Sequence, residues 1–349
     1  MARTDFHPLR VSAVDRLTDD SAAVTFAVPA DLAEVFAFAP GQSLTVKVGD
    51  ERRSYSICAP SGHAPRIGVR EVSGGLVSGW LVHRLRAGDT VEVQAPAGSF
   101  TPDLAAGGHH VLIAAGSGIT PMLSIAASVL AANVSSTVTL LYGNRRTDSV
   151  MFADEVADLK DAHPSRMQLV HVLSREPQEV ELFSGRLDAA KLRALLPVTL
   201  EVNSVDHWWL CGPFGMVTDA VDVLTELGVA RERVHRELFY VGEDPPEQAR
   251  HDDAPAGPGA EVTVVLDGRS TTVTVPPDLP VLDAVQRVRP DLPFACKGGV
   301  CGTCRALVTD GEVRMRRNYA LEQSEVDAGY VLTCQALPVS DTVTVDYDS

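Results

Sequence analysis

The sequence predicts three successive domains: an antiparallel β-barrel, an α/β domain with a parallel sheet, and a small α+β domain. Three observations support this fold class. Short runs of alternating apolar and polar residues fill residues 1–103, strand-then-helix patterns follow over 104–243, and a segment rich in proline, glycine and acidic residues separates them from 261–349. A chain of 349 residues is also too long for one ordinary hydrophobic core.

Strands are predicted in the first domain where apolar residues recur at every second position. SLTVKV (43–48) and TVEVQAP (90–96) show this pattern, and the pairs Pro40–Gly41, Gly74–Gly75 and Gly88–Asp89 mark turns. Short strands separated by glycine turns are typical of an antiparallel barrel or sandwich.

The pattern changes at His109, where the second domain begins its first strand. HVLIAAGSGITPMLSIAASVLAA predicts a buried strand, a glycine turn and a helix. TVTLLYGN (137–144) followed by FADEVADLKDA (152–162) repeats the strand and the helix, and WWLCGP (208–213) with a helix over about 216–227 closes the domain. Strands that alternate with helices favour a parallel sheet.

A linker is predicted over 244–260, because this segment is rich in proline, glycine and charge and has no apolar period. The third domain follows at 261–349. VTVVLDGRSTTVTV predicts a hairpin around Asp267–Gly268, a dipeptide that supplies the positive φ angles of a tight turn. A helix over about 281–288 and a final strand near 342–346 complete a small α+β unit.

The charge balance restricts the possible partners. A formal net charge of −16 makes nonspecific binding to nucleic acid or to an anionic membrane unfavourable. It also suggests that a macromolecular partner presents basic residues, unless the acidity serves only solubility. The N-terminus lacks the layout of a secretory signal, and no apolar run approaches the ~20 residues that span a bilayer, so we expect a cytoplasmic protein.

Four of the six cysteines are clustered, which is the strongest single signal in the chain. Cys296, Cys301, Cys304 and Cys334 have the C-x4-C-x2-C…C spacing of plant-type 2Fe–2S ferredoxins. The intervening glycines let a loop wrap closely around a cluster and direct backbone N–H groups at the sulfurs. The alternative is a zinc site, although zinc cysteines usually come as paired C-x2-C knuckles.

A flavin motif is indicated in the first domain. Arg53, Ser54, Tyr55 and Ser56 resemble the R-x-Y-S motif of the ferredoxin–NADP reductase superfamily. By that resemblance Arg53 pairs with the flavin pyrophosphate, Tyr55 stacks on the isoalloxazine ring, and Ser56 hydrogen-bonds near flavin N5. Read alone, these four residues could equally be an ordinary strand.

A second segment of that domain resembles the superfamily loop that brings backbone amides and a serine to the same phosphates. It comprises Gly74, Gly75, Leu76, Val77 and Ser78. Glycine permits the close approach of the backbone to phosphate oxygens.

The second domain carries a glycine turn between its first strand and helix. The turn comprises Gly116, Ser117, Gly118, Ile119, Thr120 and Pro121. Glycines permit close approach there, and the N-terminus of the helix attracts a pyrophosphate. The third glycine of the common dinucleotide fingerprint is missing, but G-S-G-I-T-P is the form found in this reductase superfamily.

Two further segments resemble nicotinamide and flavin contacts of the superfamily. Cys211, Gly212 and Pro213 resemble the segment whose cysteine lies beside nicotinamide C4, the alternative being a buried strand cysteine. Glu237 and Phe239 resemble the superfamily's ending, in which the ring covers the flavin and the glutamate approaches the hydride-transfer site. A plain amphipathic strand end would look similar.

Basic residues favour NADPH over NADH. An enzyme that uses NAD usually carries an acidic residue about 20 residues beyond the glycines, whereas this strand ends in Asn144, Arg145 and Arg146. Ser174 and Arg175 resemble the S-R-E segment that binds the 2′-phosphate in NADPH-using relatives. Exposed arginines are often only solvated, so NADH stays open as the donor.

Taken together, these motifs identify the chain as similar to the reductase components of phenylacetyl-CoA epoxidase systems. The resemblance implies FAD in the barrel, NADPH on the α/β domain and a β-grasp ferredoxin domain with a 2Fe–2S cluster. It further implies that electrons pass to a diiron oxygenase that epoxidises phenylacetyl-CoA in aromatic degradation. A flavin is needed between a two-electron donor and a one-electron cluster.

Two alternatives stay open at this level. One is an NADH-dependent reductase that serves a ring-hydroxylating dioxygenase or another monooxygenase, whose motifs would be almost the same. The other is a non-catalytic zinc-binding adaptor built on degenerate reductase domains. A visible spectrum with flavin and iron–sulfur absorption would support a reductase, and a colourless zinc protein would support the adaptor.

Overall fold

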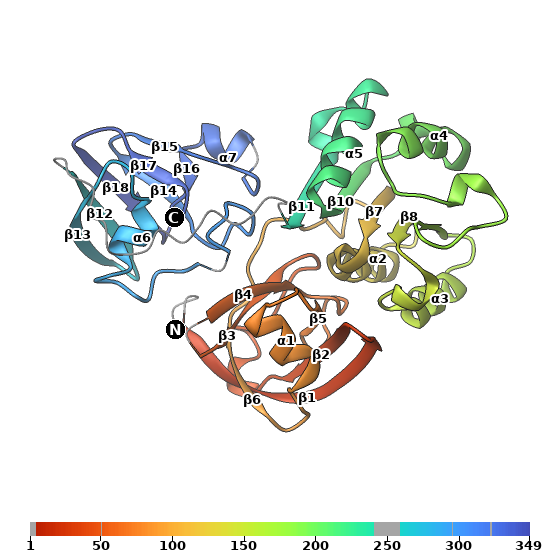
Figure 1. Cartoon of the computed structure of the whole chain (residues 1–349), viewed down its shortest axis with the longest axis horizontal. Helices are drawn as coiled ribbons and strands as arrows, with labels where there is room; N and C mark the ends of the chain where they lie inside the picture. Colours follow the sequence, from red (N-terminus) through yellow and green to blue (C-terminus); the bar gives the residue numbers. More distant parts are fainter. Residues whose placement is uncertain (1–4, 50, 241–258, 295, 322) are drawn as a thin grey trace. The chain divides into compact units, whose positions relative to one another are not determined.

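The computed structural model describes residues 5–49, 51–240, 259–294, 296–321 and 323–349. Contacts divide the chain into two compact units, which correspond to 6–240 and 259–349 among these residues. Figure 1 labels the helices and strands of both units, and each unit is described by itself. Nearly all of the linker predicted at 244–260 lies outside the described residues.

The N-terminal part of the larger unit is an antiparallel barrel. Its strands are β1 (Phe6–Thr18), β2 (Ser21–Ala27), β3 (Ser43–Val48), β4 (Glu51–Ser56), β5 (Arg66–Arg70) and β6 (Thr90–Gln94), with helix α1 (Leu76–His83). They pair in the order β4-β3-β6-β1-β2-β5, and an antiparallel bridge between Ile57 and Ile67 joins the two ends of this order. The alternating pattern therefore predicted the barrel correctly, because one face of each strand fills a closed core.

The rest of the larger unit is a five-stranded parallel sheet in the order β11-β10-β7-β8-β9. Its strands are β7 (His109–Ala115), β8 (Thr137–Asn144), β9 (Met167–Leu173), β10 (His207–Pro213) and β11 (Val234–Tyr240). Its helices are α2 (Ile119–Ala132), α3 (Ala153–Ala162), α4 (Ala189–Thr199) and α5 (Phe214–Glu226). Strand β11 and helix α4 add to the elements expected from sequence.

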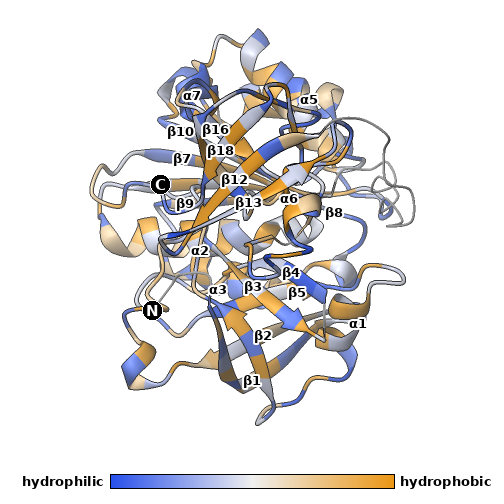
Figure 2. Ribbon diagram, turned by 90° about the vertical axis from the view of Figure 1, so that its left-hand side faces the viewer, coloured by the Kyte–Doolittle hydropathy of each residue, from blue (hydrophilic) through white to orange (hydrophobic). Residues whose placement is uncertain are grey.

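Helix α2 shows why the barrel and the parallel sheet form one unit. It is hydrophobic along most of its length, as the orange colour in Figure 2 shows, and nearly all its side chains are buried. Ala23, Cys58 and Phe100 of the barrel share its core, and Phe100 packs edge-on against Trp209 of β10 with ring centroids 5.1 Å apart. The buried Ser124 hydroxyl also donates to the Ala59 carbonyl at 2.6 Å.

The smaller unit has a mixed five-stranded sheet, in the order β13-β12-β18-β14-β16, and a two-stranded sheet of β15 and β17. Its strands are β12 (Ala260–Leu266), β13 (Arg269–Val275), β14 (Arg305–Asp310), β15 (Val313–Met315), β16 (Tyr330–Leu332), β17 (Ala336–Pro338) and β18 (Thr342–Asp346), with helices α6 (Val281–Val285) and α7 (Gln323–Asp327). The hairpin around Asp267 and the final strand are confirmed.

The helix predicted over 281–288 is shorter than expected. It ends at Val285, and the carbonyl of Val285 accepts the N–H groups of both Val288 and Arg289 in a turn that leads to Pro290. Proline lacks the N–H that would continue a helix and disfavours helical backbone at Arg289, so the helix could not extend beyond this turn. In the parts of the chain that the structure describes, we find no helix whose length and apolarity would suit a membrane span.

Candidate functional site

Strand β4 carries the predicted flavin motif on two faces. Ser54 and Ser56 lie on one face, where Ser54 Oγ is 3.3 Å from the hydroxyl of Thr45 on β3. Arg53 and Tyr55 lie on the other face because successive strand residues point to opposite sides. The exposed Arg53 guanidinium pairs with Glu51 at 2.8 Å. Burial raises the pKa of the Tyr55 hydroxyl, so its ring stays neutral.

Ser56 meets the last strand of the parallel sheet. Its hydroxyl donates to Glu237 Oε2 at 3.0 Å, although the two residues are 181 positions apart in sequence. Burial raises the pKa of Glu237 to about 7, and the hydrogen bond from Ser56 opposes that rise. A carboxyl group that titrates near neutral pH is suited to holding or moving a proton.

Cys211 joins this pair through the sheet register. It lies opposite Glu237 on β11 and opposite Ala114 on β7, so its side chain shares their face of the sheet. The thiol is fully buried, and burial together with the neighbouring Glu237 raises its pKa well above the usual range. The structure thus brings together the three residues predicted at the hydride-transfer site, with Cys211 as a neutral thiol.

The glycine turn after β7 leads directly into α2. Gly116 has φ +56°, and a Cβ atom on Gly118 would collide with the carbonyl of Cys211, so this position requires glycine. Tyr142 of β8 donates its hydroxyl to the Gly116 carbonyl at 3.1 Å, and Thr120 donates to the Ser117 carbonyl at 2.6 Å.

The start of helix α2 fits a phosphate group. No side chain of the described residues caps it by a hydrogen bond. The Ile119 N–H already donates to the Gly116 and Ser117 carbonyls, and Pro121 has no N–H, so the attraction for an anion at this end comes from the helix dipole and the preceding glycine turn. Thr120 and Pro121, both predicted in the nucleotide turn, are buried within this first turn of the helix.

The predicted phosphate loop of the barrel forms the start of α1. Gly75 is the N-cap residue, and no described side chain caps this helix by a hydrogen bond. Ser78 accepts a hydrogen bond from the Val72 N–H at 3.1 Å, so its hydroxyl holds the loop in shape. Val77 is buried, whereas Leu76 is 62% exposed. The helix N-terminus therefore suits a phosphate group.

The carboxyl ends of β8 and β9 bring the predicted 2′-phosphate residues together. The Arg175 N–H donates to the Arg145 carbonyl at 2.8 Å, and the Ser174 hydroxyl donates to the Asn144 carbonyl at 3.2 Å. Glu176 fixes the loop that follows by accepting from both the N–H and the hydroxyl of Thr147, at 2.8 and 2.7 Å. Neither Arg145 nor Arg175 has an ion pair with a described residue, so both guanidinium groups are available to an anion.

Gly212, Pro213 and Phe239 lie beside this edge of the sheet. Gly212 and Pro213 end β10, and Gly212 has φ +155°. Phe239 lies two residues beyond Glu237 on β11 and is 37% exposed, so its ring is accessible for covering a flat ligand.

The four predicted cluster cysteines collect in the smaller unit as two pairs. Cys296 contacts Cys301, and Cys304 contacts Cys334. Hydrogen bonds from the Cys301 thiol and from the N–H groups of Gly298, Val300 and Cys301 lower the pKa of Cys296 to about 5, since they favour the thiolate. Two thiolates on each of two irons match this arrangement.

Glycines shape the loop around these sulfurs. Gly299 and Gly302 have φ +79° and +67°, and a Cβ atom on Gly299 would crowd the Gln335 side chain and the Arg317 carbonyl. Gln335 donates to the Lys297 carbonyl at 2.9 Å and to Cys334 Sγ at 3.6 Å. Within the described residues no group of three or more histidine, cysteine or acidic side chains is arranged to hold a single metal ion.

Comparison with known proteins decides the family. Residues 8–101 match the oxidoreductase FAD-binding domain, 112–222 the oxidoreductase NAD-binding domain, and 264–339 the 2Fe-2S iron-sulfur cluster binding domain. The chain is 42% identical to a subunit of the 1,2-phenylacetyl-CoA epoxidase of Escherichia coli, over 99% of each chain. The chain belongs to the family of this epoxidase component.

Other relatives agree with this assignment. The ferredoxin reductase component of 3-ketosteroid-9-alpha-monooxygenase from Rhodococcus rhodochrous is 34% identical over 97% of this chain and 96% of its own. Phthalate dioxygenase reductase has the same fold, with a TM-score of 0.62 and 23% identity over 98% of each chain. The FAD/NAD-binding domain of nitric oxide dioxygenase from Vibrio cholerae matches 67% of this chain and 99% of its own, with a TM-score of 0.59 and 30% identity.

As a member of this family, the chain is an NAD(P)H-dependent oxidoreductase with FAD-binding, NAD-binding and 2Fe–2S domains. These findings confirm the fold class and the cofactor classes predicted from sequence. The individual site residues and the domain boundaries 1–103, 104–243, 244–260 and 261–349 stay predictions.

One residue beside the predicted nucleotide turn was missed by the sequence analysis. Arg70, at the end of β5, donates to the Ser149 carbonyl at 2.7 Å and to Asp20 at 3.2 Å. A Cβ atom on Gly116 would lie 3.0 Å from its guanidinium, so this barrel arginine borders the glycine turn of the parallel-sheet domain. No motif marks Arg70, because only the packing of the barrel against the sheet brings it there.

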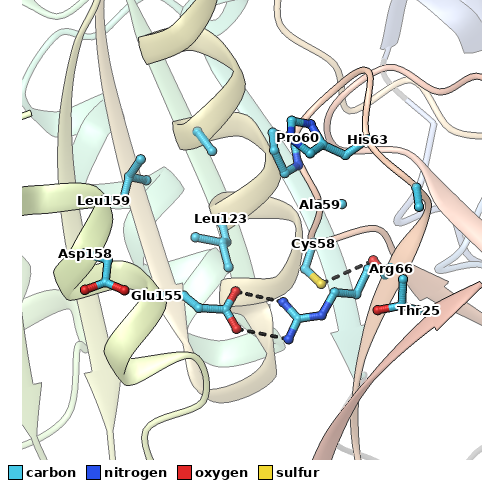
Figure 3. Close-up of a pocket in the computed structure, with 12 residues that line it drawn as sticks. Thr25, Cys58, Ala59, Pro60, His63, Arg66, Leu123, Glu155, Asp158 and Leu159 are labelled. Carbon is cyan, nitrogen blue, oxygen red and sulfur yellow. Dashed lines mark hydrogen bonds and ion pairs between the residues drawn. The ribbon is translucent and has the colours of Figure 1, made fainter. Parts of the chain in front are cut away.

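Cys58, which lies outside the cluster motif, lines a cavity of about 550 Å³ between the barrel and α2 (Figure 3). Its thiol donates to the Arg66 carbonyl at 3.2 Å, and burial raises its pKa to about 12. Arg66 forms two hydrogen bonds with Glu155 of α3, at 2.8 and 3.0 Å. Cys58 is thus an unreactive structural thiol beside an ion pair that joins the barrel to the sheet domain.

Proposed function

We propose that this chain is the reductase component of a phenylacetyl-CoA epoxidase. It takes a hydride from NADPH and delivers single electrons through FAD and a 2Fe–2S cluster to a separate diiron oxygenase. The observation that carries this proposal is 42% identity, along the whole chain, to a component of the Escherichia coli epoxidase, with all three cofactor domains in order.

The flavin, when bound, supplies the conversion of a two-electron hydride donor into one-electron steps. Residues of the barrel would hold it. Arg53 would pair with the pyrophosphate, aided by the N–H groups at Gly75 and Leu76, and the Tyr55 ring would stack on the isoalloxazine. Ser54, whose hydroxyl lies beside Thr45, would fix the conformation of β4 between these two contacts.

Glu237 and Ser56 would control a proton at the hydride-transfer site. The Ser56 hydroxyl already donates to a carboxyl group whose pKa is about 7. When Glu237 is ionised, it accepts the hydrogen bond from Ser56. When Glu237 is protonated, its own O–H can donate, and the Ser56 hydroxyl is then able to donate to a bound ring nitrogen. Cys211 would define the nicotinamide side of this site as a neutral, polarisable surface.

The nucleotide would lie along the carboxyl edge of the parallel sheet. The glycine turn of Gly116, Ser117 and Gly118, together with the dipole of α2, would bind its pyrophosphate. Arg145, Ser174 and Arg175 would bind the 2′-phosphate, which is the basis for proposing NADPH as the donor. Pro213 and Phe239 would border the nicotinamide end of the site.

A second candidate is a reductase for a monooxygenase with another substrate. The 34% identity to the ferredoxin reductase component of 3-ketosteroid-9-alpha-monooxygenase supports it, because the alignment covers nearly the whole of both chains. The two candidates differ only in the oxygenase that accepts the electrons. The motifs of the reductase do not specify which oxygenase this is.

A cytoplasmic location is part of the proposal. All six cysteines are free of disulfide bonds, and four of them form the two sulfur pairs. Thiols persist in a reducing compartment, where disulfide bonds are rare.

The test uses the purified holoprotein with FAD and cluster bound. Reduction of ferricyanide and cytochrome c is measured with NADPH and with NADH, and oxygen consumption is measured with a phenylacetyl-CoA epoxidase oxygenase component added. We expect NADPH to be preferred and phenylacetyl-CoA turnover to depend on this chain. If this chain reduced the artificial acceptors but did not sustain turnover by that oxygenase, the assignment of the partner would be overturned.

A further inference from the structure

Three arginines stand together in the smaller unit of a strongly acidic protein. Arg314, Arg316 and Arg317 lie within four residues, with no acidic residue between them, in a chain of formal net charge −16. All three are exposed. Arg314 is on β15, and the other two follow directly after this strand.

This segment lies against the cluster loop. The Arg316 N–H donates to the carbonyl of Gln335, the residue after Cys334, at 2.9 Å. The Tyr319 N–H donates to the Gly299 carbonyl at 3.1 Å, and a Cβ atom on Gly299 would lie 3.3 Å from the Arg317 carbonyl. The backbone that carries Arg316 and Arg317 therefore borders the loop of the four cysteines.

Other cations near this loop are neutralised, which sets the three arginines apart. Lys297 pairs with Asp283 at 2.8 Å. Arg305 pairs with Glu325 at 3.1 Å and stacks on the Tyr330 ring at 3.6 Å. The three arginines, in contrast, have no ion pair with any described carboxylate, so their charge is directed at solvent.

We propose that Arg314, Arg316 and Arg317 form a docking surface for an acidic patch on the separate electron acceptor. This inference rests on the proposed function, because it assigns the contact through which the iron–sulfur domain reaches its partner. Charges act within about 8 Å at physiological ionic strength, so the local cluster governs docking more than the net charge of the chain does. The partner surface is therefore acidic, opposite in sign to the one that the net charge suggests.

Charge complementarity gives the chemistry of the partner. An acidic surface on another protein would be attracted to these unpaired guanidinium groups. We call Arg314, Arg316 and Arg317 the exit arginines.

The experiment compares two charge-reversal variants of the holoprotein. R316E/R317E reverses the two exit arginines nearest the cluster loop, and R269E/R287E makes the same charge change at exposed residues on β13 and after α6. The probes are cytochrome b5, whose docking face is acidic, and cytochrome c, whose docking face is basic. Binding is measured by titration calorimetry and reduction by NADPH is measured as kcat/KM, at about 20 mM and about 500 mM salt.

For R316E/R317E at low salt, we expect the Kd for cytochrome b5 to rise about tenfold and kcat/KM to fall in proportion. Cytochrome c reduction should stay the same or increase. R269E/R287E should change each value less than twofold, and high salt should remove the difference between the variants. R316K/R317K, which keeps the charge, should behave as the wild type and shows that the fold tolerates substitution there.

Two results would overturn the docking surface. One is an equal loss in R316E/R317E and R269E/R287E, which would reflect net charge alone. The other is a slower flavin-to-cluster step in stopped-flow spectra with unchanged cytochrome b5 binding, which would assign the arginines to the chain's own flavin unit. A separate outcome would contradict the proposed function itself. In that case the wild type would reduce ferricyanide with NADPH and bind cytochrome b5, but it would not reduce cytochrome b5.

Discussion

The proposed hydride-transfer site and the cluster loop are built in opposite ways. Ser56 comes from the barrel, whereas Cys211 and Glu237 come from two neighbouring strands of the parallel sheet. Burial raises the pKa values of Cys211 and Glu237. The cluster loop comes from one short segment plus Cys334, and backbone N–H groups stabilise its first sulfur. The hydride-transfer residues depend on the packing of whole domains, whereas the cluster loop depends on local chain geometry. Substitutions in the two places should therefore affect different steps of electron transfer.

The largest expected effect is on the cluster side. Cys301→Ser should abolish transfer to one-electron protein acceptors, by more than about 100-fold, while flavin reduction by NADPH continues, because only the cluster loses a ligand. Iron and sulfide content and the visible spectrum report the cluster, and stopped-flow absorbance reports flavin reduction. Cys58→Ser is the matched control and should keep both activities. Loss of flavin reduction in Cys301→Ser would mean that the two sites are not independent.

The next effect is on the hydride side. Glu237→Gln should slow flavin reduction by about 10- to 100-fold and remove its pH dependence near pH 7, because the amide does not titrate. The cluster should still form, with an unchanged spectrum. Ser56→Ala, which removes the hydrogen bond and keeps the acid, should shift the pH midpoint upward. A pH profile that is the same in Glu237→Gln and the wild type would remove the acid from the mechanism.

Glu237 also predicts a change of stability with pH. Its raised pKa means that the folded chain holds the proton more tightly than the unfolded chain does. This stabilisation is complete below about pH 4.5 and is lost as the pH rises through about 7. When the pH is raised from 5 to 8, the free energy of urea unfolding should therefore fall by up to about 2–3 kcal/mol more in the wild type than in Glu237→Gln.

A smaller effect is expected at the edge of the parallel sheet. Arg175→Ala should raise KM for NADPH about tenfold and leave KM for NADH nearly unchanged, because only the 2′-phosphate contact is lost. Arg186→Ala, an arginine outside the site, is the control. If KM rose equally for NADPH and NADH, Arg175 would have a structural role and would not bind the 2′-phosphate.

The last prediction concerns stability alone. His110 is buried, stacks on His207 at 5.0 Å and accepts a hydrogen bond from Trp209 Nε1 at 3.2 Å. Burial lowers its pKa to about 4, so its stabilising contribution is present above pH 6.5 and is lost as the pH falls toward 4. Between pH 7 and pH 5 the wild type should lose about 1–2 kcal/mol more of its free energy of unfolding than His110→Gln does, an effect opposite in sign to that of Glu237. His110→Gln should reduce this dependence without changing electron transfer at pH 7.

The same comparison explains what the sequence could predict. The candidate cluster ligands could be proposed from the sequence because three of the four cysteines and the glycines lie in one short segment. The strand, turn and helix over 109–132 could be predicted because apolar periodicity is local. The pairing of β11 with β10, which places Glu237 opposite Cys211, depends on long-range contacts. VHRELFY (234–240) has charged residues inside it and shows no clear strand pattern, and helix α4 contains Pro197, a poor helix residue.

Arg70 and the exit arginines illustrate a second limit. An arginine has the same sequence appearance whether it is solvated, paired or placed beside a site. Arg70 becomes part of the nucleotide region only through the packing of β5 against the glycine turn. The exit arginines stand out only because the other cations near the cluster loop form ion pairs and these three do not. No rule of residue spacing predicts that difference.

The hydrogen bond between Ser56 and Glu237 has a consequence for any attempt to divide the protein. It links an early strand of the barrel to the final strand of the larger unit, and Phe100 on Trp209 covers the junction between them. A fragment ending near residue 103 would expose Ala23, Cys58 and Phe100 to water and leave Ser56 without its acceptor. Truncation for crystallography or fusion should therefore cut after Tyr240, beyond the last strand of the larger unit, and never inside the flavin–nucleotide body.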